Sequence, residues 1–387
     1  MAGISKKIFK KEFNKKIIKI NKALNRIRYT LPYDYNYFDI KNYLERLYFF
    51  EYKELLDFKE YYDKKNLYLL KHNKKSRYFL PSIEIILKRK TLMKKLLKLE
   101  IKKEYQVNFK EEIVQKKYIE LQKERELKNK SRYENLLKAQ ERVQKVEPEF
   151  LDKLLGLYFR KTTTQKEKMY LFSEIEKYYC KKTINFFRKI HDTEYNNQLR
   201  ERAFKRLQEW GHYVRLRKGK FIVIKTKNKK RKKFIKEIYK FQISTIEKTP
   251  FELEKRIEES LDQKLKIYDY FISHSSKNFL FVQKLKDKLN SKGKSIYCDW
   301  ISDDHYLKRT LVGEATKLVI NKRLEQSKYL ILIDTKEARN SIWVKYELNY
   351  FYNLKKKIYV WNTSSQEIEE LTKLWFIDEH YLNLKLY

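Results

Sequence analysis

The chain has 387 residues, of which 42% are hydrophobic, and a formal net charge of +40. This length is sufficient for two or three domains with their own cores, and the ordinary apolar content excludes a chain that is disordered throughout. Gly and Pro are scarce while Tyr and Phe are abundant, which favours helices with aromatic cores. No run of about 18 apolar residues occurs, so we expect no membrane span.

The positive charge is distributed unevenly along the chain. Most of the basic excess lies before residue 263. A field of this size attracts polyanions such as nucleic acid or anionic lipid. The alternative is that Lys coats solvated helices, because Glu is interleaved with Lys and no Arg-rich groove stands out. The composition leaves both interpretations open.

The two cysteines, Cys180 and Cys298, are far apart in the sequence and have neither metal-binding nor redox spacing. The chain also begins without an apolar segment of signal-peptide length. These features predict a reduced, cytoplasmic protein with no metal site.

Residues 1–150 are predicted to form a helical region. Apolar residues recur at helical spacing between residues 7 and 27, and Pro32 and Pro81 mark breaks. Residues 92–145 have the pattern of long charged helices, which favours an extended helical hairpin or a coiled-coil arm, with a plain solvated face as the alternative.

Residues 151–248 are predicted to form a helical domain with a basic β-hairpin. Thr164 and Glu167 have the spacing of a capping box, and Gly211 is expected to end a helix over residues 197–210. Residues 213–217 and 221–224 alternate like two hairpin strands. Helices followed by a basic hairpin are typical of a winged helix that contacts nucleic acid; a small structural hairpin is the alternative.

Residues 249–265 are predicted to be a linker helix, with Thr249 as its N-cap and Pro250 in its first turn. Residues 266–387 then alternate strands and helices. Strands are expected at residues 267–273, 295–299, 329–334 and 357–361, and helices at residues 277–292, 307–326 and 341–354. This alternation predicts an α/β domain with a parallel sheet. Ligands of such sheets bind beyond the carboxyl ends of the strands. The polar or aromatic residues expected at such ends are Ser273, His274, Asp299, Trp300 and Thr335.

Four motifs follow one another in this last region. They are Tyr268-Asp-Tyr-Phe-Ile-Ser-His-Ser-Ser, Tyr297-Cys-Asp-Trp-Ile-Ser-Asp-Asp, Arg323-Leu-Glu-Gln-Ser-Lys-Tyr-Leu-Ile-Leu-Ile-Asp, and Asn340-Ser-Ile-Trp-Val-Lys-Tyr-Glu-Leu. Each motif is weak alone, but their order and spacing resemble a bacterial TIR (Toll/interleukin-1 receptor) domain over roughly residues 266–365. The resemblance implies a flavodoxin-like fold.

The resemblance also implies that the protein cleaves NAD+ between nicotinamide and ribose, with NAD+ as substrate and no cofactor. Glu347 matches the family's catalytic carboxylate, which would stabilise an oxocarbenium-like transition state. The implied substrate-binding residues are Phe271, Ser273, His274, Asp299, Trp300 and Trp343. Alternatives stay open: Trp343 as a core aromatic, Trp300 as a loop anchor, His274 as a turn-stabilising group and Glu347 as a surface carboxylate near Lys345.

Bacterial TIR enzymes commonly act in anti-phage immunity, so the resemblance further implies activation by self-association, with the basic helical region as sensor or oligomerisation module. The product would be linear or cyclic ADP-ribose, the cyclic form acting on a partner effector. The loop Ile301-Ser-Asp-Asp-His-Tyr-Leu-Lys lacks the Gly or Pro of many TIR loops, which leaves the mode of self-association open. The rival hypothesis is a non-enzymatic TIR scaffold coupled to a nucleic-acid-binding N-terminal region.

Overall fold

The structure is a computed structural model that describes residues 4–215, 224, 226–241, 249–303, 306–307 and 313–370, with side chains from residue 6. It divides into two compact units. Unit 1 contains the described residues of 1–137 and 207–223, and unit 2 those of 138–206 and 224–387. The chain therefore passes between the units more than once, whereas the sequence suggested consecutive domains at 1–150, 151–248, 249–265 and 266–387, and those bounds stay a prediction.

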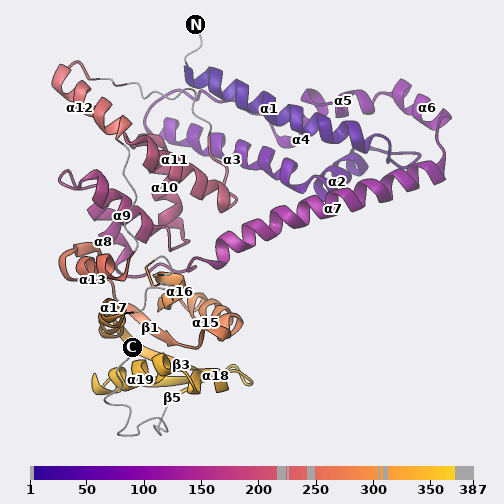
Figure 1. Cartoon of the computed structure of the whole chain (residues 1–387). Helices are drawn as coiled ribbons and strands as arrows, with labels where there is room; N and C mark the ends of the chain where they lie inside the picture. The colour runs from indigo at the N-terminus through magenta and orange to yellow at the C-terminus, as the bar shows by residue number, and fades with distance from the viewer. Residues whose placement is uncertain are drawn as a thin grey trace. The chain divides into compact units, whose positions relative to one another are not determined.

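Unit 1 is helical, as expected (Figure 1). Its helices are α1 (Ile4–Ile27), α2 (Tyr37–Leu47), α3 (Phe49–Lys71), α4 (Ile83–Lys90), α5 (Met93–Leu96), α6 (Leu99–Val107) and most of α7 (Glu111–Glu141). Ile20, Leu24 and Ile27 of α1 are fully buried against side chains from the next helices. Ile18, another apolar residue between residues 7 and 27, is 54% exposed, because α1 buries only one stripe of its surface.

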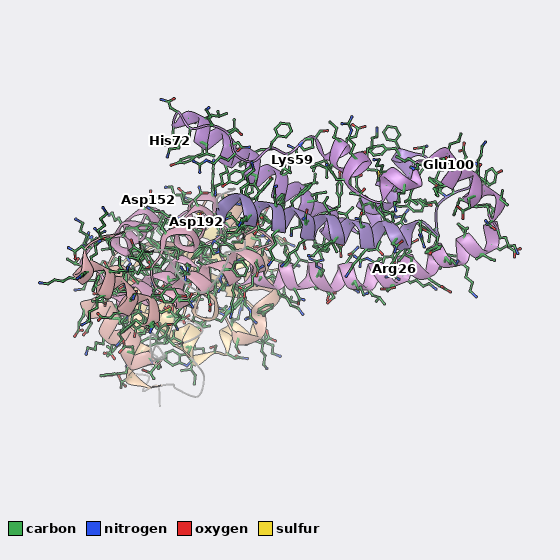
Figure 2. All side chains as sticks on the ribbon, turned by 90° about the horizontal axis from the view of Figure 1, so that it is seen from above. Arg26, Lys59, His72, Glu100, Asp152 and Asp192 are labelled. Atoms are coloured by element: carbon green, nitrogen blue, oxygen red, sulfur yellow. The ribbon has the colours of Figure 1, made fainter. Side chains whose placement is uncertain are left out.

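The charged region at residues 92–145 forms three helices, α5, α6 and α7, and not one continuous helix. Within unit 1, α7 is tied to the earlier helices by charged side chains. Arg26 of α1, labelled in Figure 2, forms an ion pair with Glu124 of α7. The buried Arg125 donates to the backbone oxygen of Leu47 (3.0 Å) and forms an ion pair with Glu51 (2.9 Å). Helix α7 is therefore held against the earlier helices of unit 1 by specific charged contacts and not by an apolar stripe.

The first part of unit 2 is also helical. Its helices are α8 (Leu151–Tyr158), α9 (Gln165–Ile175), α10 (Lys181–Thr193), α11 (Asn197–Glu209), α12 (Lys229–Lys240), α13 (Pro250–Glu259) and α14 (Leu261–Lys264), with the end of α11 in unit 1. The predicted capping box at Thr164 and Glu167 begins α9, and Thr249 caps α13. Gly211 follows α11 with a φ of 78°. Residues 216–223 of the predicted hairpin lie outside the described residues, so the winged-helix interpretation stays a prediction.

The second part of unit 2 contains a five-stranded sheet. Its strands are β1 (Tyr268–Ser273), β2 (Ile296–Tyr297), β3 (Ser327–Asp334), β4 (Ile358–Asn362) and β5 (Ile368–Glu370). The strand order is β2-β1-β3-β4-β5, which is the flavodoxin-like order expected from the sequence. All neighbouring pairs are parallel except β4 and β5. The carboxyl ends of β1 and β3 are in register, with Ser273 opposite Leu332.

Helices cover both faces of this sheet (Figure 1). They are the single-turn 3-10 helix η1 (Ser276–Asn278), α15 (Phe279–Ser291), α16 (Asp299–Ser302), α17 (Glu314–Glu325), α18 (Lys336–Arg339) and α19 (Ile342–Asn353). Val282 and Leu285 of α15 pack with Ile272 and Ile331 on one face. On the other face, α17 contacts β3, and α19 contacts β1 and β4. The domain is therefore the three-layer α/β structure that the alternation predicted.

Three expectations for this part need correction. The strand predicted at residues 295–299 is only Ile296–Tyr297, because Asp299 already begins α16. The helix predicted from residue 307 is α17, which begins only at Glu314; Leu307 and Gly313 are not helical. The antiparallel strand β5 was not expected, since its charged Ile-Glu-Glu sequence has no apolar alternation and forms by pairing with β4.

The outer edge of β2, which pairs with no further strand among the described residues, is hydrogen-bonded by the side chain of Gln144. The amide of Gln144 donates to the backbone oxygen of Ile296 (2.8 Å) and accepts from its backbone nitrogen (2.9 Å). Gln144 also forms a parallel bridge with Tyr178 through backbone hydrogen bonds. The helical part of unit 2 thus satisfies a strand edge that would otherwise be open to pairing with another chain.

Among the described helices, none combines the length and apolar character needed to cross a bilayer.

Candidate active site

The candidate site lies where the carboxyl end of β1 meets α19. Ser273 is the last residue of β1 and is fully buried. Its hydroxyl donates a hydrogen bond to Oε2 of Glu347 over 2.6 Å. Ser341 fixes the start of α19, since its side chain accepts from the backbone nitrogen of Val344, and this places Glu347 in the second turn. The carboxyl group of Glu347 is thereby held at the carboxyl ends of the parallel strands, where ligands of such folds bind.

The environment of Glu347 raises the pKa of its carboxyl group to about 8. Burial is the main cause, and the negative charge of Asp299 acts in the same direction. The hydrogen bond from Ser273 opposes both, because it favours the charged form. The unliganded group is therefore mostly protonated at neutral pH, and a cation placed beside it would lower its pKa and release the proton.

His274 lies next to this pair and faces the end of β2. Its Nδ1 lies 3.1 Å from the backbone oxygen of Ile272, which fixes this nitrogen as the donor. Its Nε2 lies 3.6 Å from Oδ1 of Asp299 and 3.8 Å from Sγ of Cys298. Asp299 begins α16 and is half exposed, whereas Cys298 is fully buried. Residues that are 24 positions apart in sequence thus converge at one end of the sheet.

Three aromatic residues predicted to bind substrate have different surroundings. Trp300 is partly buried and packs against Phe279, with 4.8 Å between ring centroids. Trp343 is partly exposed and lies edge-on to Tyr346 (6.2 Å). Phe271 is buried beneath Ser273 on the same side of β1, where it packs against Tyr297. Trp300 and Trp343 are each partly exposed, whereas Phe271 is buried, and all three substrate-binding roles stay predictions.

Sequence reasoning missed Asn278, which organises the turn after β1. Its side-chain oxygen accepts from the backbone nitrogen of Ser275 (3.1 Å) and from the hydroxyl of Thr335 (3.1 Å). Thr335 follows β3, so Asn278 links the ends of two central strands. The Ser275–Asn278 spacing of a capping box was the available signal.

Residues 271–382 match the TIR domain family. The chain is also 37% identical over 377 residues to a protein of Cytobacillus dafuensis named putative cyclic ADP-D-ribose synthase TIR2, and the match covers 97% of this chain and 96% of the relative. The chain belongs to the TIR domain family. A second relative, probable 3' cyclic ADP-D-ribose synthase ThsB' of Bacillus cereus (strain MSX-D12), is 35% identical over 95 residues, covering 24% of this chain and 49% of that protein. No solved structure shows significant similarity.

The similarity to the first relative is not confined to the TIR domain. The TIR domain match covers residues 271–382, whereas the similarity to the Cytobacillus dafuensis protein extends over the helical residues before them as well. The helical part and the TIR domain should therefore be considered together.

A buried ion cluster joins these two parts within unit 2. It is defined by Glu174, Lys177, Lys266, Asp303 and Arg323. Glu174 accepts from Lys177 (2.6 Å) and Lys266 (2.7 Å), and Asp303 pairs with Lys177 (3.3 Å) and Arg323 (2.9 Å). Asp303, which the sequence left as part of a polar loop, is fully buried and directly follows α16 of the TIR domain. Asp304 and His305 of the same loop lie outside the described residues.

The charges of this cluster are balanced only when one cation is neutral. Burial raises the pKa of Asp303, but Arg323 and Lys177 outweigh it and hold that pKa down to about 2. Burial lowers the pKa of Lys266 to about 7, and Lys177 and Arg323 act in the same direction against the carboxylate of Glu174. Because the cluster holds three cations and two carboxylates, Lys266 is the group that can lose its proton near neutral pH.

Proposed function

We propose that this chain cleaves NAD+ at the bond between nicotinamide and ribose, as an NAD+ nucleosidase or ADP-ribosyl cyclase. The observation that carries the proposal is the Ser273–Glu347 hydrogen bond at the carboxyl end of β1, which holds one carboxyl group in a mostly buried position. The names of both relatives, as synthases of cyclic ADP-D-ribose, support the same class of reaction.

The chemistry requires only one such group. Nicotinamide in NAD+ is already a cation, so it leaves as a neutral molecule when the electron pair of the C–N bond moves to its ring nitrogen. Positive charge then develops on the ribose, and the carboxylate of Glu347 stabilises that charge. The bond is replaced by one to water, which loses a proton, or to a nucleophile within the ADP-ribose itself, which gives a cyclic product.

The raised pKa of Glu347 fits this role. When the cationic nicotinamide ring binds near Glu347, its positive charge would favour loss of the proton from the Glu347 carboxyl group. Ser273 would keep one carboxylate oxygen fixed, so that the other is directed to the ribose. Trp300 and Trp343 are the predicted partners for the flat rings of NAD+.

The decisive experiment measures NAD+ loss and nicotinamide release by the full chain. We expect turnover by the wild type and a loss of at least about 100-fold in Glu347→Gln, which preserves size but cannot carry charge. Glu337→Gln is the matched control, because Glu337 is an exposed carboxylate on the nearby α18. Separation of the products would distinguish linear from cyclic ADP-ribose. Equal NAD+ loss in the wild type and Glu347→Gln would reject the proposed role of Glu347.

The biological context is proposed from the resemblance to bacterial TIR enzymes. We infer an anti-phage function in which self-association of TIR domains completes the site, and a cyclic product would act on a partner effector. If so, specific activity should rise with protein concentration, and sedimentation should show larger species over the same range. Activity per chain that is constant from nanomolar to micromolar protein would exclude self-association as the trigger.

We also propose, as a second candidate function, that the basic N-terminal region contacts nucleic acid. The observation that favours it is α12, whose first five residues, 229–233, are all basic and exposed. A salt-dependent shift of duplex DNA or RNA by the full chain, weakened when these five residues are changed to Gln, would support nucleic-acid binding. Binding that does not depend on them would place the contact elsewhere.

A further inference from the structure

Three potential metal ligands converge at the end of β2. His274, Cys298 and Asp299, here called the His–Cys–Asp cluster, each offer one ligand atom, and these atoms all lie within 4.8 Å of one another. The separations are 3.6 Å between His274 Nε2 and Asp299 Oδ1, 3.8 Å between His274 Nε2 and Cys298 Sγ, and 3.8 Å between Cys298 Sγ and Asp299 Oδ1. The two contacts of Cys298 Sγ are long, weak sulfur hydrogen bonds, and the three atoms together form a nearly equilateral triangle.

These separations fit tetrahedral coordination of zinc. With zinc–nitrogen and zinc–oxygen bonds of about 2.0–2.1 Å and a zinc–sulfur bond of about 2.3 Å, tetrahedral angles place ligand atoms about 3.3–3.6 Å apart. The observed triangle is only slightly wider. A small rotation of the exposed Asp299 side chain would shorten its two sides, and a slight approach of His274 to Cys298 would shorten the third. A dication would draw the ligands together by that amount.

The histidine is already oriented as a ligand. Its Nδ1 is directed to the backbone oxygen of Ile272, which leaves the lone pair on Nε2 facing Cys298 and Asp299. Such a backbone partner on the second ring nitrogen is the usual arrangement behind a zinc-binding histidine. The donor set of one nitrogen, one sulfur and one carboxylate oxygen suits zinc, whereas magnesium and calcium prefer oxygen alone.

We propose that His274, Cys298 and Asp299 bind a zinc-class divalent cation at the edge of the candidate active site. Three protein ligands leave the fourth tetrahedral position for water. Binding exchanges the thiol proton of Cys298, which passes to solvent, for the metal, with no change in oxidation state.

The position of this site predicts its effect on turnover. His274 directly follows Ser273, whose hydroxyl holds Glu347, and Asp299 acts electrostatically on the same carboxyl group. A bound dication would disfavour the positive charge that develops on the ribose by electrostatic repulsion. It would also be bound by His274 and Asp299, two of the predicted substrate-binding residues. We therefore expect zinc to inhibit NAD+ cleavage. This consequence rests on the proposed function, whereas metal binding itself does not.

The test is titration of the full chain, freed of metal with a chelator, with cobalt(II) as a spectroscopic probe of the zinc site. We expect one equivalent of cobalt to give a thiolate-to-metal charge-transfer band with the visible bands of tetrahedral coordination. Zinc should displace the cobalt and abolish these bands. Cys298→Ser should lose the charge-transfer band and weaken binding by about 100-fold, since loss of even an outer partner of a ligand costs 10–100-fold.

The chain provides its own control for this experiment. Cys180→Ser removes the second cysteine, which lies in the helical part of unit 2, and should leave the spectrum unchanged. His274→Gln is a second variant of the cluster that tests the site if Cys298→Ser fails to fold, as judged by circular dichroism. No stoichiometric binding, or a band retained in Cys298→Ser and lost in Cys180→Ser, would overturn the proposal.

A parallel measurement separates this proposal from the proposed function. If the protein cleaves NAD+, zinc should inhibit it reversibly, and a chelator should restore the rate. If it cleaves no NAD+ under any condition, the cobalt spectrum still decides metal binding by itself. Inhibition by zinc that persists unchanged in Cys298→Ser would reject the His–Cys–Asp cluster as the inhibitory site.

Discussion

Asp303 and Arg323 form an ion pair with 2.9 Å between the carboxylate Oδ2 and the guanidinium Nε, and both side chains are completely buried. Asp303 ends the turn that begins with Asp299, so this pair fixes one end of α16. Through Lys177 the same carboxylate is joined to the helical part of unit 2. The turn that carries Asp299 and Trp300, two of the predicted substrate-binding residues, is thus anchored by the region that the sequence suggested as a sensor.

The pH dependence of turnover should report the carboxyl group of Glu347. Because its pKa is raised to about 8, the fraction of charged carboxylate in the free enzyme grows as the pH rises from 6 to 9. We expect kcat/KM for NAD+ to rise over this interval with a midpoint near 8. The assay should contain a chelator, so that metal binding does not affect the profile.

Replacement of Ser273 should move this midpoint in a defined direction. Its hydrogen bond favours the charged form of Glu347, so Ser273→Ala should raise the pKa of the carboxyl group and shift the profile to higher pH. Ser276→Ala, at an exposed position three residues later, is the control. A lower midpoint in Ser273→Ala would contradict the assigned direction of this hydrogen bond.

Removal of a carboxylate from the buried ion cluster should destabilise the protein more than removal of the amine of Lys266. Glu174→Gln would leave Lys177 and Lys266 without their shared carboxylate, and we expect a loss of about 3–5 kcal/mol in the free energy of unfolding. Lys266→Met should cost much less, because the pKa of Lys266 is lowered to about 7 and its neutral form is readily populated. Urea denaturation at neutral pH measures both.

The same lysine predicts a slope of stability with pH. The pKa of Lys266 is lower in the folded protein than in the unfolded chain, so between about pH 7 and pH 10 the unfolded chain binds more protons. This group therefore makes the protein more stable as the pH rises through that window. Comparison of wild type and Lys266→Met at several pH values should show that the variant lacks this part of the slope.

The side chain of Gln144 should protect the edge of β2. Gln144→Ala removes two hydrogen bonds to the backbone of Ile296 and leaves buried backbone groups without those partners, at a cost of about 1–3 kcal/mol. We also expect faster aggregation, because an open strand edge pairs with other chains. Gln115→Ala, at an exposed position of α7, should change neither unfolding nor light scattering.

Two glycines should respond oppositely to the same substitution. Gly211 has a φ of 78°, and an added Cβ would lie 2.5 Å from Cδ1 of Leu136, so Gly211→Ala should destabilise unit 1 by more than about 1 kcal/mol. Gly156 lies within α8 with no atom within 4 Å of the added Cβ. Gly156→Ala should therefore stabilise the protein by about 0.5–1 kcal/mol. Thermal unfolding of the two variants beside the wild type tests the pair.

The sequence alone determined the class of the C-terminal domain, because each of its signals is local. The signals are the apolar runs at residues 267–273 and 329–334, the helical pattern at residues 277–292, and the spacing from Trp343 to Glu347. Each of them involves residues close together in the chain. Local backbone preference and side-chain periodicity are sufficient to specify such elements. The strand order then followed from the resemblance to TIR domains.

Only the tertiary structure decided which distant polar groups meet. The Ser273–Glu347 hydrogen bond, the meeting of His274 with Cys298, and the burial of Asp303 each join residues that are 20 or more positions apart. No periodicity encodes such a contact, since it depends on strand order and on which helix covers which face. The charged residues of the buried ion cluster resemble solvated ones in sequence, because a carboxylate and its distant cation are recognisable as a pair only after the chain has folded.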